Sequence, residues 1–364
     1  MAPATLRQLR DEAQKIYGEY QARFAGKPRA TRDLEALDDI IGRLEEVVEG
    51  ARKLQNGGQN PALSSFIEQA VENLETYEKE REGIARAKSR GPAAEQAGRL
   101  ATWANLFFGQ YLRHFAGKNR ATRDVGLLNE IISELEFVET QMKKVIADKG
   151  FESTQADLQT VQNNLQLYRD ERAEIFSSRR DATLEQRASY LAVVANEQFA
   201  IYDYHFAGKP RASRRPGLLH RVIATLESVR DEMAEIEDEG LDSEQNRQNR
   251  DIIDQKLELY EEEFEQIQKV RRETSSSDLV GHLGQAANAA AQQYSEHFAG
   301  EDRASRNLEL LSRICDELLD VGRQMRQLKD SFDSRANDKN LIIVLDNAML
   351  YQGEFEKIRE VQRD

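Results

Sequence analysis

Cysteine, proline and long apolar runs are scarce in this sequence. Its 364 residues include one cysteine, Cys315, and six prolines. A single cysteine excludes a disulfide scaffold and a cysteine-rich zinc site. No run of about eighteen apolar residues occurs, so we expect no membrane span. The first residues carry acidic groups and no apolar core, which argues against a secretory signal, and we expect a cytoplasmic protein.

A surplus of basic residues is also missing. The formal net charge is −14 at pH 7. An acidic chain without a long basic segment is unsuited to a phosphate backbone, so we expect no nucleic-acid partner. Residues 1–183 carry −2 of this charge and residues 184–364 carry −12. An elongated molecule with such unlike ends favours head-to-tail contacts over symmetric ones.

What the chain does contain is one nonapeptide, repeated four times. The copies FAGKPRATR, FAGKNRATR, FAGKPRASR and FAGEDRASR begin at Phe24, Phe115, Phe206 and Phe298, which lie 91, 91 and 92 residues apart. A tyrosine stands four residues before each phenylalanine, and a Tyr-x-x-Glu-x-x-x-Ile pattern recurs later in each copy. Similarity at one fixed period is typical of a repeat protein.

Each copy is expected to form three helices. In the first copy, apolar residues recur at intervals of three and four within residues 6–20, 37–54 and 67–84, which is the spacing of one helical face. The pattern predicts an all-α fold of four tandem three-helix bundles, antiparallel, left-handed and packed like coiled coils. The predicted units are residues 1–92, 93–183, 184–275 and 276–364, arranged as an elongated rod or superhelix.

The nonapeptide is expected to form the corner between the first and second helix of a unit. Its glycine suits the left-handed backbone position past a helix end. Its Ser or Thr suits the N-cap of the next helix, where a hydroxyl accepts a free backbone N–H. The residues predicted to shape the corner are Gly26, Gly117, Gly208, Gly300, Thr31, Thr122, Ser213 and Ser305.

The basic residues of the corner have two alternative roles. Cations beside free N–H groups at a helix start could bind an anion or a partner's carboxylates. The candidates are Lys27, Arg29, Arg32, Lys118, Arg120, Arg123, Lys209, Arg211 and Arg214. Alternatively, one arginine of each corner pairs with a glutamate of the third helix, or with carbonyls at a helix end, and locks the corner. These glutamates are Glu80, Glu171, Glu263 and Glu354.

The fourth copy separates these roles in part. There Glu301 and Asp302 replace the lysine and its neighbour, while both arginines remain. The corner therefore does not need its lysine, and any anion site in the fourth unit is weakened by two negative charges.

Other chemistry is sparse. His114, His205 and His297 stand before the motif phenylalanine without a second ligand at metal-binding spacing, so we expect solvated or stacking histidines and no metal site. Cys315 occupies a position that is isoleucine in the other copies and is expected in the core. No phosphate loop, nucleophile elbow or paired carboxylates stand out, so we expect neither enzymatic activity nor a cofactor.

These expectations favour a non-enzymatic structural or scaffold protein. It would mediate protein–protein assembly, including polymerisation, with other proteins or further copies of itself as partners. The alternative is a module in which the repeated corners recognise anions, namely acidic or phosphorylated ligands.

Overall fold

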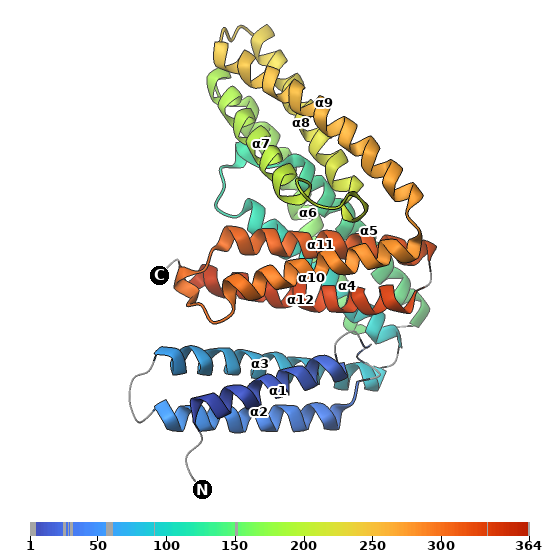
Figure 1. The fold of residues 1–364 in the computed structure, drawn as a ribbon. Coiled ribbons are helices and arrows are strands. Elements are labelled where there is room, and N and C mark those ends of the chain that lie inside the picture. The colour runs from blue at the N-terminus through green and yellow to red at the C-terminus, as the bar shows by residue number, and fades with distance from the viewer. Residues whose placement is uncertain are drawn as a thin grey trace.

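The computed structural model describes residues 5–362, except residues 25, 26, 28, 30, 31, 56–60, 91, 150, 151 and 333. Over these residues the chain forms twelve α-helices and no strand, which confirms the predicted all-α fold (Figure 1). None of the helices in the described part combines the length and the apolar character needed to cross a bilayer.

The helices follow one another in threes, and each three pack together as a unit (Figure 1). In units two to four a short 3₁₀ turn, labelled η, lies between the first and second helix. Unit one contains α1 (Leu6–Phe24), α2 (Leu34–Gln55) and α3 (Pro61–Arg90), and unit two contains α4 (Pro92–Phe115), η2 (Arg120–Thr122), α5 (Val125–Lys149) and α6 (Glu152–Arg180). Unit three contains α7 (Leu184–His205), η3 (Arg211–Ser213), α8 (Pro216–Asp238) and α9 (Glu244–Glu273), and unit four contains α10 (Ser276–Phe298), η4 (Arg303–Ser305), α11 (Leu308–Ser331) and α12 (Arg335–Val361).

Helices are interrupted at the joints between units two and three and between units three and four. α4 begins at a proline, which has no backbone N–H to donate to a preceding turn. Thr183 begins α7 with a capping box that includes Gln186, and Ser275 caps α10 by accepting the N–H of Asp278. Side chains that satisfy the N–H groups of a new helix thus set the later two joints.

An aromatic stack ties the first helix of each unit to the third. The tyrosine before the motif phenylalanine stacks on the tyrosine of the Tyr-x-x-Glu pattern. The ring centroids lie 4.2 Å apart for Tyr20 and Tyr77, 4.1 Å for Tyr111 and Tyr168, 3.9 Å for Tyr202 and Tyr260, and 3.8 Å for Tyr294 and Tyr351. The two repeated tyrosines therefore form one packing element of the core. Cys315 is also buried, at its predicted core position.

The units are not arranged as an elongated rod, in which each unit would contact only its neighbours in sequence. Units one and three each have a separate apolar core, whereas units two and four share one. In Figure 1, α10–α12 lie between α1–α3 and α7–α9, and α12 packs on α4. The last unit therefore turns back among the other three.

The single tryptophan explains part of this arrangement. Trp103 of α4 lies in the core shared by units two and four, and a Cβ atom added to Gly322 of α11 would be 3.1 Å from its ring. The guanidinium of Arg326 lies over the same ring, 4.8 Å from the centroid of Trp103. Because Trp103 and Gly322 each occur in only one unit, this contact has no equivalent elsewhere in the repeat.

Candidate functional site

The corner turns through a glycine with a left-handed backbone. Gly117, Gly208 and Gly300 have φ angles of +79°, +73° and +80°. A side chain is strained in this region, which is why glycine is required just past the helix end. This is the conformation predicted for the motif glycine, although Gly26 lies outside the described residues.

Both arginines of every corner bind the glutamate of the third helix. In unit three, Arg211 donates from Nε and Nη2 to Glu263 over 3.0 and 2.9 Å, and Arg214 donates to the same carboxylate. All four glutamates are buried, whereas Arg211, the first arginine of the corner, is 48% exposed. The equivalent pairs join Arg29 and Arg32 to Glu80, Arg120 and Arg123 to Glu171, and Arg303 and Arg306 to Glu354.

The second arginine also satisfies a backbone carbonyl. Its guanidinium donates to the carbonyl at the lysine position of the motif, over 2.7 Å from Arg32 to Lys27, 3.1 Å from Arg123 to Lys118, 2.8 Å from Arg214 to Lys209 and 3.0 Å from Arg306 to Glu301. The sequence offered a glutamate or a helix-end carbonyl as alternative partners for the corner arginine, and the second arginine binds both a glutamate and a backbone carbonyl.

The predicted N-cap role of the motif Ser and Thr is wrong in the described corners. Thr122, Ser213 and Ser305 end the 3₁₀ turn, and their hydroxyls donate to the carbonyl three residues earlier over 3.0, 3.0 and 2.8 Å. The reason is that the turn inserts residues before the second helix begins. Thr31 lies outside the described residues. The helix N–H groups are capped further along the chain, by Asp33, Asp124 and Asn307.

The lysines of the corner reach across to other units. Lys118 Nζ lies 2.7 Å from Glu197 in unit three, and Lys209 Nζ lies 2.7 Å from Glu317 in unit four. Lys27 is exposed. The predicted set of anion-binding cations is therefore spread over internal pairs rather than gathered on one free surface.

The sequence interpretation missed one residue of the corner. Near the end of the third helix, Arg179 Nε donates to the carbonyl of Ala121 over 2.9 Å. Arg271 in unit three donates in the same way to Ala212 and Arg214, and Gln362 in unit four donates to Arg306. These three residues occupy equivalent repeat positions, which is the signal that could have revealed them.

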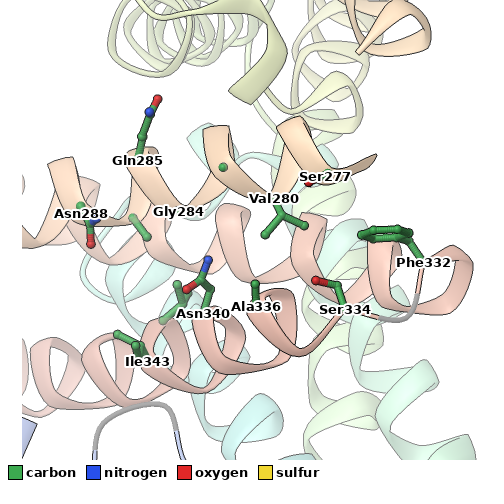
Figure 2. Close-up of a pocket in the computed structure, with 13 residues that line it drawn as sticks. Ser277, Val280, Gly284, Gln285, Asn288, Phe332, Ser334, Ala336, Asn340 and Ile343 are labelled. Atoms are coloured by element: carbon green, nitrogen blue, oxygen red, sulfur yellow. The ribbon is translucent and has the colours of Figure 1, made fainter. Parts of the chain in front are cut away.

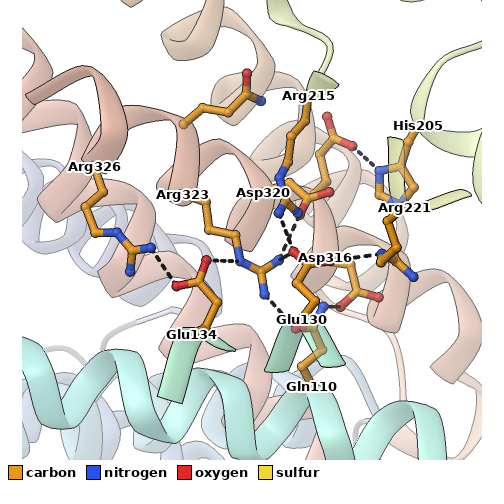
Figure 3. A network of polar contacts seen from close by, with 12 residues as sticks. Gln110, Glu130, Glu134, His205, Arg215, Arg221, Asp316, Asp320, Arg323 and Arg326 are labelled. Atoms are coloured by element: carbon orange, nitrogen blue, oxygen red, sulfur yellow. Dashed lines mark hydrogen bonds and ion pairs between the residues drawn. The ribbon is translucent and has the colours of Figure 1, made fainter. Parts of the chain in front are cut away.

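A buried polar network joins units two, three and four (Figure 3). Its centre is Glu130 of α5, which pairs with Arg215 at the N-cap of α8, with Arg221 of α8 and with Arg323 of α11. Arg323 has a side chain only 1% exposed, and it also contacts Asp320 and Gln110. A helical pattern predicts which residues are polar but not which helices meet, so this network could not be derived from the sequence.

Two histidines of the motif belong to this junction. His114 donates to Asp316 over 2.6 Å, so the expectation of a solvated or stacking histidine is wrong for it. His205 donates to Glu317 over 2.9 Å and also stacks edge to face on Tyr204, with ring centroids 4.9 Å apart. His297 is exposed. Both carboxylates lie on α11, which explains why histidines of two units converge on the fourth.

The paired carboxyl groups stay ionised although they are buried. Burial alone would raise the pKa of Glu317, but hydrogen bonds from His205 and Lys209 lower it to about 2. Burial opposes ionisation of Asp316 as well, and His114 with Arg113 holds its pKa far below the ordinary value. Both groups are therefore fixed negative charges that attach unit four to units two and three.

A groove of about 440 Å³ lies between α10 and α12 (Figure 2). Its thirteen lining residues, which include Gly284, Asn288, Asn340 and Ile343, are all uncharged. The groove thus offers no acid or base for catalysis. Within the described ranges, no group of three or more His, Cys, Asp or Glu residues is placed to hold a metal ion.

Comparisons with known proteins provide no relative from which a function could be inferred, so a function is proposed from the structure of the chain. Searches against protein-family models, curated proteins and solved structures returned no match to this chain.

Proposed function

We propose that the protein is a non-enzymatic scaffold that binds other proteins on the outer faces of its helical units. The observation that supports this is a repeated, exposed leucine. Leu167, Leu259 and Leu350 precede the stacked tyrosine on the third helix of units two, three and four, and they are 55%, 48% and 45% exposed. Unit one has Thr76 at this position.

Apolar side chains at equivalent positions provide repeated anchors for a partner. Burying such a leucine stabilises a complex by about 25 cal/mol per Å² of apolar surface removed from water. Three anchors on one rigid helical framework bind more tightly together than singly, because the second and third contacts form within one complex.

The alternative, recognition of acidic or phosphorylated ligands, has less support. The corner arginines already share buried carboxylates, so an incoming anion would have to displace a charge-assisted pair. Only the exposed Lys27 and the half-exposed Arg29 would remain for such a ligand in unit one.

The experiment that tests the scaffold is affinity capture from native lysate followed by mass spectrometry. The triple variant Leu167→Ser, Leu259→Ser and Leu350→Ser should lose captured partners while its melting temperature stays close to that of the unchanged protein. Leu112→Ser, which alters an exposed leucine of α4, is the matched control. Partners that bind the triple variant as well as the unchanged chain would argue against the leucine anchors.

A further inference from the structure

The corner turn of unit four is less covered than those of units two and three, although Ser65 of α3 donates to the carbonyl of Gly300 over 3.4 Å. In units two and three the first helix of the next unit, α7 or α10, packs on the turn, and the alanines Ala121 and Ala212 are 2% and 6% exposed. In unit four the equivalent Ala304 is exposed. Arg303 at the edge of this turn pairs with Glu68 of α3, yet that contact leaves Ala304 open.

Three of the five ion pairs that hold unit three on unit two in the described ranges are formed by Lys118 and Glu130. Lys118 of the unit-two corner binds Glu197 of α7 over 2.7 Å. Glu130 of α5 binds Arg221 of α8 over 2.9 Å and also pairs with Arg215. These contacts connect the corner of unit two to α7, and α5 of unit two to the start of α8 in unit three.

The residues at the positions of these three pairs in units four and one are also oppositely charged. Each of them has the opposite sign to its equivalent in units two and three. Each residue has an equivalent at the same distance from the motif phenylalanine in another unit. Lys118 and Glu130 correspond to Glu301 and Arg313 in unit four, and Glu197, Arg215 and Arg221 correspond to Lys15, Asp33 and Asp39 in unit one. The three pairs would therefore become Glu301 with Lys15, Arg313 with Asp33, and Arg313 with Asp39. The other two ion pairs of the junction between units two and three have no pair of opposite charges at the equivalent positions of units four and one.

This complementarity is absent from the other junctions along the chain. Between units one and two, the equivalent pairs include Lys27 with Leu106 and Asp39 with Glu130, which do not attract. Between units three and four, Arg221 would face Arg313. Like charges at these positions are unfavourable, so the match between units four and one is not a general property of the repeat.

The complementary residues are exposed or half-exposed and are not paired with each other within one chain, although the guanidinium of Arg313 lies 5.4 Å from the ring centroid of Tyr204 in unit three. The side chains of Lys15, Asp39 and Arg313 are 72%, 62% and 42% exposed, and Asp33 and Glu301 are exposed as well. Lys15 and Asp39 make only long ion pairs within unit one, of 3.5 and 3.6 Å. Unit one instead contacts unit four of its own chain through α3, where Glu68 and Glu72 meet Arg303.

We propose that unit four of one copy binds α1 and α2 of a second copy, in the way that unit three sits on unit two. The corner of unit four accepts α1, and α11 lies against α2. This contact joins two different surfaces, so it repeats from copy to copy and builds a head-to-tail chain. The proposal rests on the proposed scaffold function and names a further copy of the protein as one of its partners.

Sedimentation velocity of the full-length protein over a concentration series at low salt tests this contact. We expect association that weakens as salt is added, because the pairs are exposed. Lys15→Glu and Glu301→Lys should each weaken association about tenfold or more, since like charges then face each other. The double variant should restore it, because its reversed charges attract again. Lys269→Glu, the same charge change on an exposed site of α9, is the control and should have no effect.

A second charge swap checks the helix contact independently. Arg313→Glu should weaken association about tenfold, and combining it with Asp33→Arg and Asp39→Arg should recover it. A protein that stays monomeric over the whole series, or that associates equally well with Lys15→Glu, would overturn the proposal. Such a result leaves the capture of other proteins through Leu167, Leu259 and Leu350 unaffected, so failure of self-association is distinguishable from failure of the scaffold function.

Discussion

Two arginines share one buried glutamate at each corner. This ratio of two positive charges to one negative charge determines how the corner affects stability. The carboxylate of Glu171, for example, neutralises one of the charges of Arg120 and Arg123, and the carbonyl of Lys118 accepts a further hydrogen bond. A buried charge cluster of this kind adds little net stability, because desolvation offsets the attraction. It does penalise any arrangement in which one partner is missing, and so it fixes the angle between the helices.

The corner predicts unequal effects for its two arginines. Arg123→Ala should lower the free energy of unfolding by about 3 kcal/mol, because it leaves a buried carboxylate short of one partner. Arg120→Ala should cost about 1 kcal/mol or less, since the Arg120 side chain is 46% exposed and its ion pairs are screened by water. Urea unfolding followed by circular dichroism measures both. Equal losses for the two variants would contradict the shared-glutamate description.

The Glu317 carboxylate predicts acid sensitivity of the junction with unit four. Its pKa in the folded protein, about 2, lies below the ordinary value of 4.5. The stabilisation from its contacts is therefore complete above pH 4.5 and is lost as the pH falls from 4.5 towards 2. At pH 7 it amounts to roughly 3 kcal/mol at most.

Comparison with Glu317→Gln measures this contribution. The difference in unfolding free energy between the two proteins should be largest near neutral pH and should shrink below pH 4.5. A difference that stays constant between pH 7 and pH 3 would assign the effect of the substitution to packing and not to the charge.

Close approach of helices from units two and four depends on glycines. A Cβ atom at Gly322 would lie 3.1 Å from the Trp103 ring, and one at Gly109 of α4 would meet the side chain of Gln352 on α12. Glycine is a poor helix former, so its presence within these helices is explained by the space it leaves. The contact between the units is thus a property of paired helix surfaces and not of any one helix.

Filling this space should separate the units. Gly322→Val is expected to reduce stability by about 1–3 kcal/mol, because the added methyl groups overpack the shared core. Emission of the only tryptophan, Trp103, should shift to longer wavelength as its ring is displaced towards water. Gly353→Val on α12 is the matched control, since a Cβ atom there has no neighbour within 4 Å. An unchanged emission spectrum in Gly322→Val would show that the ring is not held against α11.

The shared core also changes how the stability of the four units combines. Tandem repeats that contact only their neighbours have stabilities that add along the chain. Here units two and four share one apolar core, and the network around Glu130 adds unit three. Unit one has its own core and is joined to unit four by ion pairs, among them Arg32 with Asp346, Glu68 with Arg303 and Glu72 with Lys357. We therefore expect units two to four to unfold together and unit one to unfold more independently.

Deletion variants test this coupling. Removal of residues 276–364 should lower the melting temperature of the remainder by more than removal of residues 1–92, because it exposes the apolar surface around Trp103. Differential scanning calorimetry of the two shortened chains and the intact protein compares them directly. Similar melting temperatures for both deletions would support additive units instead.

The repeat period predicted much of this protein. Apolar spacing predicted helices within each unit, and the motif predicted a left-handed glycine and an arginine–glutamate pair at the corner. These features depend on residues close in sequence or on a pattern that recurs in every copy, so one chain carries enough information to derive them. The N-cap prediction failed for a local reason: Thr122 is the last residue of a 3₁₀ turn, and α5 begins only at Val125.

The position of unit four, by contrast, depends on surfaces that meet only after the chain has folded. Trp103 with Gly322 and Glu130 with Arg323 are pairs of residues from distant units, and none of them belongs to the repeated pattern. Short-range periodicity specifies which face of a helix is buried within its unit, because that face is apolar. It does not specify which outer faces pack together, since that choice depends on shape and charge complementarity between whole units. The chain therefore encodes its units locally and their arrangement only through long-range contacts.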